Sequence, residues 1–134
     1  MAKYASAATL DGGVAYIKAN ATAMKLLSSW TVGNNTVASI SGVTLATVTM
    51  TTTDFTLAGA DNAARTCTTA SGKSVNASAS GGGSTGGTGN SGNCIAFCDS
   101  TNVLWVTDET SKQAVTSGNP VNFPSLVYTA GQPT

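Results

Sequence analysis

Acidic side chains are the first candidates for chemistry, because two facing carboxyl groups can act as acid and base in glycoside hydrolysis. The chain offers five for such a pair: Asp54, Asp61, Asp99, Asp108 and Glu109. Four of them adjoin Ser, Thr, Asn or Gly in predicted turns, where an Asp side chain accepts hydrogen bonds from backbone N–H groups. Asp108 and Glu109 are consecutive and are expected to form a solvated corner, and Asp61-Asn62 is too sparse for a calcium loop. The carboxylates therefore predict turns rather than an active site.

Nucleophilic catalysis lacks its usual base in this chain. Ser and Thr are abundant, but there is no His, which removes the Ser-His and Cys-His pairs that activate a hydroxyl or a thiol. We therefore predict that the protein is not an enzyme, that it has no catalytic residues and that it needs no cofactor. A periplasmic or lysis enzyme is the weakest hypothesis for this sequence.

The cysteines are Cys67, Cys94 and Cys98. Cys94 and Cys98 lie on one face of a predicted strand, about 13 Å apart at ~3.3 Å per residue, which is too far for a bond to each other. Cys67 could form a disulfide with either one if its strand is adjacent. Three small buried thiols are the favoured interpretation for a protein made in a cytoplasm. Without His, and with this Cys spacing, no zinc or other metal site is predicted.

Residues 81–93, GGGSTGGTGNSGN, are the one low-complexity segment. A phosphate-binding loop would end in Lys-Ser or Lys-Thr and lead into a helix, whereas this segment leads into the strand-like CIAFC. We predict a surface loop instead. The aromatic residues could form a sugar-binding platform, but their strand-like spacing favours a place in the core. They are Trp30, Phe97, Trp105, Phe123 and Tyr128.

Composition bounds the remaining function classes. The 134 residues suit one domain, and only 9% are charged, against roughly a quarter in typical domains. Six basic and six acidic residues cancel and are scattered, so nucleic-acid binding is not expected. No apolar run reaches the ~20 residues of a membrane span, and the start MAKYASAATLDGG lacks the apolar core of a secretory signal. We expect synthesis in a cytoplasm and no membrane partner.

The chain is expected to be all-β and mainly antiparallel. CIAFC and VLWVT, separated by DSTN, predict a β-hairpin that continues as a meander of three or four strands to Tyr128. Within VNFPSLVY, Pro124 cannot donate to a ladder, which predicts a sheet edge or a bulge. Further strands are predicted at Ala23–Trp30, 43–50, 54–59, 64–70 and 73–80, with a bulge or burial on both faces between Leu45 and Val48.

The N-terminal region is the exception to this β pattern. Leu10, Val14, Ile17, Ala21 and Met24 recur at helical spacing, and Asp11 is the expected N-cap of a helix at Asp11–Asn20. Residues 1–9 are expected to form an arm or a short edge strand, and residues 10–134 a single domain. We predict a compact β-sandwich or barrel-like domain with one short N-terminal helix and the Gly-rich loop at 81–93.

Ordered segments of the chain resemble a group of small structural proteins of tailed bacteriophages. They are LDGGVAYIKANATAM, KLLSS, DFTLAG with Arg65, and above all AFCDSTNVLWVTDETSKQAVTSGNPVNFPSLVY, so that the resemblance covers most of residues 10–129. The Gly-rich segment is longer than expected for that group, and the cysteines stand where aliphatic residues are usual. The resemblance implies a virion component, most plausibly a capsid decoration (cement) protein on the outside of the capsid lattice.

Such a protein would bind the major capsid protein and associate with itself as a dimer or trimer. We expect the N-terminal arm or the sheet edges to make the capsid contacts, because edge strands can pair with another chain. The alternative is a tail, neck or fibre-associated module that binds host-surface glycans through exposed aromatic residues and the Gly-rich loop.

Overall fold

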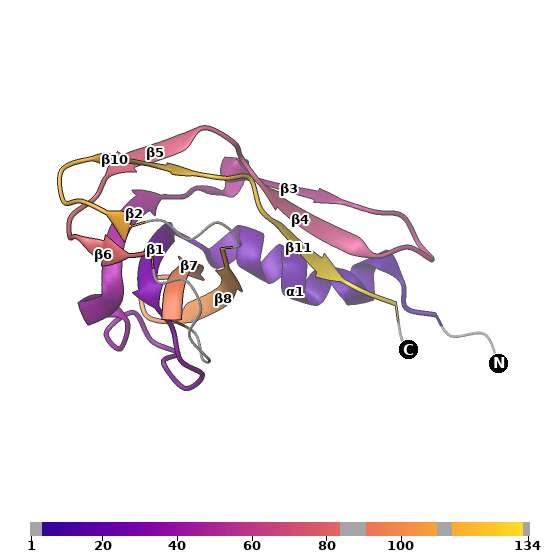
Figure 1. The fold of residues 1–134 in the computed structure, drawn as a ribbon. Coiled ribbons are helices and arrows are strands. Elements are labelled where there is room, and N and C mark those ends of the chain that lie inside the picture. The colour runs from indigo at the N-terminus through magenta and orange to yellow at the C-terminus, as the bar shows by residue number, and fades with distance from the viewer. Residues whose placement is uncertain (1–3, 84–90, 110–113, 133–134) are drawn as a thin grey trace.

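The computed structural model describes residues 4–83, 91–109 and 114–132 (Figure 1). For residues 91 and 92 it describes the backbone alone. It contains one α-helix and short antiparallel strands in several sheets, which confirms the predicted fold class. In chain order the described elements are α1 (Ala7–Asn20), β1 (Ala23–Ser29), β2 (Thr44–Thr49), β3 (Phe55–Ala58), β4 (Arg65–Thr69), β5 (Lys73–Asn76), β6 (Gly81–Gly82), β7 (Ser91–Cys98), β8 (Val103–Asp108), β9 (Ala114–Val115), β10 (Pro120–Phe123) and β11 (Val127–Ala130).

The first layer is a four-stranded sheet with the order β2-β1-β7-β8. Its β7–β8 hairpin is the one expected from CIAFC and VLWVT, and Asp99 shapes the turn between the two strands. Leu104 is an extra residue in β8, because Phe97 pairs with Trp105 while Cys98 pairs with Val103. β2 also has an extra residue, Leu45, which lies near the place where the sequence indicates a bulge.

The second layer is a long antiparallel ribbon that crosses over the first layer and the helix (Figure 1). One half pairs β10 with β5, and the other half is a three-stranded sheet with the order β11-β4-β3. Between the two halves, residues 124–126 face the four residues 69–72, so the register shifts by one. The extra residue lies in the segment 69–72 and not in VNFPSLVY, so the predicted bulge in VNFPSLVY is not found. The alternative prediction, a sheet edge, is confirmed, because β10 and β11 are both edge strands.

The predicted meander is wrong beyond the β7–β8 hairpin. β9 pairs with β6 in a separate two-stranded sheet, whereas β10 pairs with β5 and β11 with β4 in the second layer, so these C-terminal strands do not continue the first sheet. Alternating apolar residues identify a strand and its buried face, but every strand carries the same backbone donors and acceptors. Which neighbour a strand pairs with is therefore decided by the packing of the two layers.

The helix begins earlier than the sequence indicates. α1 starts at Ala7, and the N-cap is Ser6, whose hydroxyl accepts a hydrogen bond from the Thr9 N–H at 3.2 Å. Asp11 is therefore not the N-cap, and α1 takes in the last three residues of the segment 1–9 that we expect as an arm. The predicted end at Asn20 is confirmed. Val14 and Ile17 are buried, and the helix lies against β3, β4 and β11.

Both faces of the first sheet are buried. Met24, Leu26, Ile95 and Phe97 face the main core between the layers, together with side chains of α1, β3, β4 and β10. The opposite face carries a second cluster of Leu27, Ile40, Cys94, Ala96 and Cys98, over which Trp30, Val37 and Val43 pack. This arrangement explains why CIAFC is apolar at every position, since a strand covered on both faces has no solvated side.

The Gly-rich segment is not a loop over its whole predicted range. Gly81 and Gly82 form β6, and residues 91–93 already belong to β7; residues 84–90 lie outside the described part. Gly83 has a φ of +79°, and a Cβ there would approach the Ala114 backbone N to 2.5 Å, so only glycine fits. In the described part of the chain, no helix is long and apolar enough to cross a membrane.

Candidate functional site

Two of the five candidate carboxylates, Asp54 and Asp99, serve local structure. Asp54 completes a capping box with Thr51 and forms an ion pair with Lys73 at 2.8 Å. Asp99 accepts hydrogen bonds from the backbone N–H groups of Thr101 at 2.7 Å and Asn102 at 2.5 Å. Within the described ranges, no group of three or more His, Cys, Asp or Glu side chains could hold a metal ion.

Asp61 and Asp11 fasten the helix to the β3–β4 connection. Asp61 Oδ1 accepts a hydrogen bond from the Ala7 N–H at 2.8 Å, at the start of α1. Asp11 receives two hydrogen bonds from the Arg65 guanidinium, at 2.6 and 3.2 Å, and these bonds raise the pKa of Arg65. Both carboxylates are thus engaged in holding two segments together that are far apart in the sequence.

Two hydrogen-bonded carboxyl groups have lowered pKa values. Burial alone would raise the pKa of Asp54, but hydrogen bonds from Lys73 and Thr51 outweigh it, and the net shift is downward. Backbone hydrogen bonds from Asn102 and Thr101 lower the pKa of Asp99. Both groups are therefore held in the ionised form, as expected of caps rather than of a general acid.

The three cysteines are fully buried and form no disulfide, and Cys94 Sγ donates a hydrogen bond to Asp108 Oδ1 at 3.1 Å. Cys67 belongs to the main core, whereas Cys94 and Cys98 belong to the second cluster on the other face of the first sheet. That sheet separates Cys67 from both candidate partners for a disulfide. Burial raises the pKa of Cys67, and that of Cys98 to about 11, so these thiols are poor nucleophiles.

The aromatic side chains pack against the cores, as their spacing predicts. Phe97 is fully buried, stacks on Trp105 with ring centroids 4.6 Å apart and meets the edge of Phe55 at 6.0 Å. Trp105 in turn meets Tyr128 of β11 at 5.4 Å. Phe123 is buried, and Trp30 is half-buried with its Nε1 donating to the Asn34 carbonyl. Phe97 and Phe123 are thus not open to a sugar ligand, whereas Trp30 and Trp105 are half-buried.

The two layers are joined along one side, which we call the closed side and which is formed by β2 and residues 73–79. The backbone N–H groups of Ser78 and Ala79 donate to the Leu45 carbonyl at 2.8 and 3.3 Å. Lys73 Nζ donates to the Thr49 carbonyl at 3.4 Å. Hydrogen bonds therefore continue from one layer into the next on this side.

The opposite side, which we call the open side, is formed by the outer edges of β8, β10 and β11. These are the outermost strands of their sheets, and within the described part no backbone hydrogen bond joins β8 to β10 or β11. The layers meet there through side chains, of which the Trp105–Tyr128 pair is one contact. The open side is our candidate functional site.

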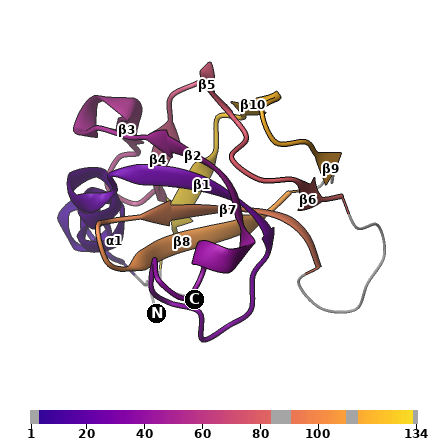
Figure 2. The ribbon, with the colours of Figure 1, turned by 90° about the vertical axis from the view of Figure 1, so that its left-hand side faces the viewer.

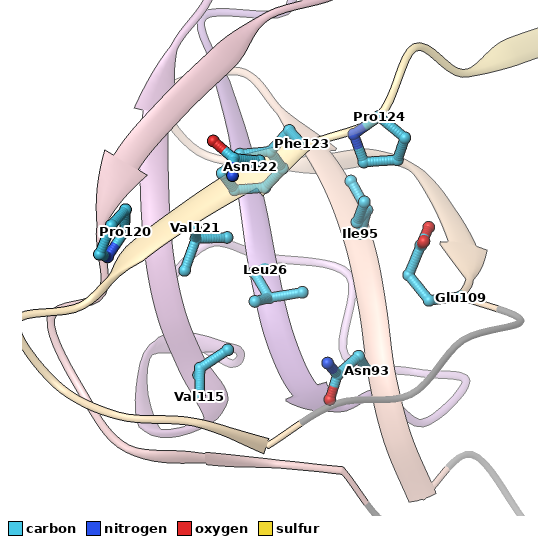
Figure 3. Close-up of a pocket in the computed structure, with 10 residues that line it drawn as sticks. All are labelled: Leu26, Asn93, Ile95, Glu109, Val115, Pro120, Val121, Asn122, Phe123 and Pro124. Carbon is cyan, nitrogen blue, oxygen red and sulfur yellow. The ribbon is translucent and has the colours of Figure 1, made fainter.

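A cavity of about 240 Å³ lies on the open side, between β10 and the strands β1 and β7 (Figure 3). Seven of its ten lining residues have apolar side chains, and the three polar ones are Asn93, Glu109 and Asn122. Asn93 is only 5% exposed, and its Oδ1 accepts a hydrogen bond from the Gly83 N–H at 2.9 Å. Glu109 comes directly after β8, and burial raises its pKa.

Glu109 is the functional candidate whose surroundings the sequence does not predict. The predicted solvated corner at Asp108 and Glu109 is wrong for Glu109: Asp108 is exposed, but Glu109 is half-buried and points along the cavity wall beside Ile95 (Figure 3). Nothing local marks this difference, because the neighbouring wall comes from β10, more than ten residues further along the chain. The tertiary arrangement alone separates the two consecutive carboxylates.

A second hollow, a groove of about 210 Å³, runs along β8 and is lined by Trp30, Asn35 and Val103–Val106.

We compared the chain with protein-family models, curated proteins and solved structures, and none of them matches the chain. The geometry and the residues of the chain itself therefore carry the functional argument.

Proposed function

We propose that this protein is a structural virion protein of a tailed bacteriophage, a decoration (cement) protein that binds the outside of the major capsid lattice and stabilises it. The sequence resemblance suggests this class of phage structural protein. The observation that supports the proposal is the open side, whose strand edges offer a surface for binding the capsid. The protein would be made in the bacterial host cytoplasm and come to lie on the capsid. It would act by binding and not as an enzyme.

β11 is the strand edge best suited to docking. Edge strands of monomeric proteins are often blunted by charged residues, Pro or bulges. β10 has Pro120 at its start and Pro124 just after its end, and β8 contains the bulge at Leu104. β11 is Val-Tyr-Thr-Ala with no charge, and Val127 is 53% exposed. A capsid strand that pairs with β11 would extend the β11-β4-β3 sheet.

Stabilisation would then follow from mass action on a lattice. A decoration protein that bridges neighbouring capsid subunits adds interface area to the assembled shell, and stable interfaces bury about 1,200–2,000 Å². The symmetry of the lattice repeats each contact, so modest individual affinities act together. A dimer or trimer placed on a capsid symmetry axis would fit the same scheme.

Copy number and position in an intact particle test the proposal. We expect hundreds of copies distributed over the capsid surface of purified virions, measured by quantitative mass spectrometry and by electron cryomicroscopy. A handful of copies at a single vertex, or none in the particle, contradicts a decoration role. Release of the protein should also lower the temperature or force at which the shell breaks.

The N-terminal arm needs a narrower test than removal of residues 1–9. Loss of those nine residues should weaken capsid binding, but it also removes the Ser6 cap and the first residues of α1. Gln132 additionally bonds both backbone groups of Ala5, at 2.9 and 3.1 Å. A deletion of residues 1–3 spares these contacts, and a protein shortened in this way that decorates normally contradicts a role for the arm.

A tail, neck or fibre-associated module that binds host-surface glycans is the second candidate. The groove along β8 favours it, because Trp30 and Trp105 both border that groove and aromatic rings can pack against sugars. Saturable quenching of tryptophan fluorescence by host surface glycans, together with a location at the tail vertex, would support this candidate. Copies spread over the capsid and no glycan binding would exclude it.

A further inference from the structure

The cavity on the open side is too small for most free ligands and is lined like a slot for one side chain. Pockets for cofactors and drug-sized molecules usually measure about 300–1,000 Å³, whereas this cavity measures about 240 Å³. Leu26, Ile95, Val121 and Phe123 provide the apolar walls. Methylene groups pack well against such walls, and a long side chain can carry a polar head past them to the rim.

Glu109 gives the cavity its charge. Its carboxyl group is half-buried, and this burial disfavours the charged form and raises the pKa. The ion pairs found among the described residues are Arg65–Asp11 and Lys73–Asp54, and neither involves Glu109. A cation placed beside a partly desolvated carboxylate recovers part of the hydration energy that the carboxylate has lost.

We propose that this cavity binds a basic side chain, lysine or arginine, of a partner protein, with the aliphatic stem between β10 and β7 and the cationic head at Glu109. The inference rests on the proposed function only for the identity of the partner, which would be the capsid protein. A metal ion is a poorer occupant, because one carboxylate is far from the six to eight oxygen ligands that calcium takes.

The position of the cavity relative to the strand edges supports a ligand from a protein chain. Val121, Asn122 and Phe123 of β10 line the cavity, and β11 follows β10 after three residues. An extended segment that pairs with β11 and continues along the ribbon would therefore pass the cavity. Its alternate side chains point to one face, so one basic residue in that segment can enter while its neighbours stay in solvent.

The first test uses blocked amino acids on the isolated protein, so that it does not depend on the virion. Nα-acetyl-lysine methylamide and Nα-acetyl-arginine methylamide carry the proposed head groups, and Nα-acetyl-norleucine methylamide is the neutral control of nearly the same shape. We expect saturable NMR shifts at Asn93, Glu109 and Asn122, with Kd values on the order of millimolar for the basic probes. The norleucine probe should bind at least about tenfold more weakly, because it lacks the charge that Glu109 recognises.

Two matched variants test whether Glu109, and not the adjacent Asp108, recognises the charge of the lysine probe. Glu109→Gln should weaken binding of the lysine probe by about fivefold or more, whereas Asp108→Asn, a change of equal charge at the adjacent exposed residue, should leave it within about twofold. Equal binding of lysine and norleucine probes overturns the proposal, as does an unchanged affinity in the Glu109 variant or a set of shifts remote from the cavity. The comparison of probes on the unaltered protein stands even if a variant folds poorly.

Particles separate the site from the proposed function. If the basic probes bind at Glu109 but the protein is absent from the capsid, the site holds and its partner is another protein. If the protein decorates capsids and Glu109→Gln decorates with unchanged affinity, the decoration role holds and the capsid protein does not supply the basic side chain, which overturns the inference as stated for that partner.

Discussion

The closed and open sides of the sandwich solve the same problem differently. Both are places where a sheet ends and leaves backbone groups without a partner strand. On the closed side β5 lies beside β2 (Figure 2). There the Leu45 carbonyl accepts hydrogen bonds from Ser78 and Ala79, and Lys73 Nζ donates to the Thr49 carbonyl of β2. On the open side, ring contacts such as Trp105–Tyr128 link the layers, and the outer edges of β8, β10 and β11 pair with no other strand in the described part of the chain.

This difference shows how one small domain can be rigid and still available for binding. Buried backbone donors and acceptors must be satisfied within the chain, and the closed side meets that requirement with its own residues. An edge exposed to water has no such requirement and can exchange water for another chain. The closed side should therefore respond to mutation through stability, and the open side mainly through binding.

The largest effect is expected on the closed side. Leu45→Ala removes a buried side chain at the bulge of β2 and should lower the free energy of unfolding by about 2–5 kcal/mol. Val127→Ala on the open side removes exposed methyl groups and should change it by no more than about 0.5 kcal/mol. Urea unfolding of the two variants measures both values. Equal losses would show that β11 is as integral to the fold as β2.

The next effect concerns binding and not folding. Val127→Lys places a charge on the free edge strand and should reduce capsid affinity at least about tenfold, which is 1.4 kcal/mol. Ser74→Lys makes the same charge change on the exposed face of β5, the ribbon strand of the closed side, and should leave affinity nearly unchanged. Decoration assays with purified capsids measure both variants. A larger loss for Ser74→Lys would move the docking surface to the closed side.

The aromatic link across the open side should contribute a smaller amount to stability. Tyr128→Leu keeps an apolar side chain against the core but loses the edge contact with Trp105, and about 0.5–1.5 kcal/mol of unfolding free energy should go with it. Tyr128→Phe retains the ring and serves as the control. If both variants lose the same amount, the hydroxyl and not the ring contact holds the layers here.

The smallest expected effect is a pH dependence of opposite sign on the two sides. Asp54, paired with Lys73 of β5, has a pKa below its ordinary value of 3.8, so its stabilisation is present above that value and is lost as pH falls through the folded-state pKa. Glu109 has a pKa above its ordinary value of 4.5. Its contribution is therefore full below pH 4.5 and is lost as pH rises through the folded-state pKa.

Urea unfolding between pH 3 and pH 7 should resolve the two contributions. Asp54→Asn should flatten the fall in stability on the acid side, whereas Glu109→Gln, which mimics the protonated acid, should remove the decline above pH 4.5. Identical pH profiles for the wild type and the Glu109 variant would mean that the cavity does not desolvate this carboxyl group.

The local features of the fold could be predicted because they depend on neighbours in the chain. The β7–β8 hairpin follows from two apolar runs around DSTN, and the place of VNFPSLVY at a sheet edge follows from the missing N–H group of Pro124. The end of α1 at Asn20 could be predicted for the same reason. Its start could not, since Asp11 looks like a cap in sequence but is engaged by Arg65, 54 residues away.

The fold class and the lack of a histidine base for nucleophilic catalysis follow from the amino-acid sequence alone. A chain without His, with few charges and with strand-like apolar runs forms an antiparallel β domain and lacks the usual pairs for nucleophilic catalysis. Three features depend instead on how the chain packs: the first sheet separates Cys67 from Cys94 and Cys98, Glu109 lines a cavity while Asp108 is exposed, and β11 is an edge strand. The physical reason is that burial and strand pairing depend on which distant segments pack together, and backbone groups are alike in every strand.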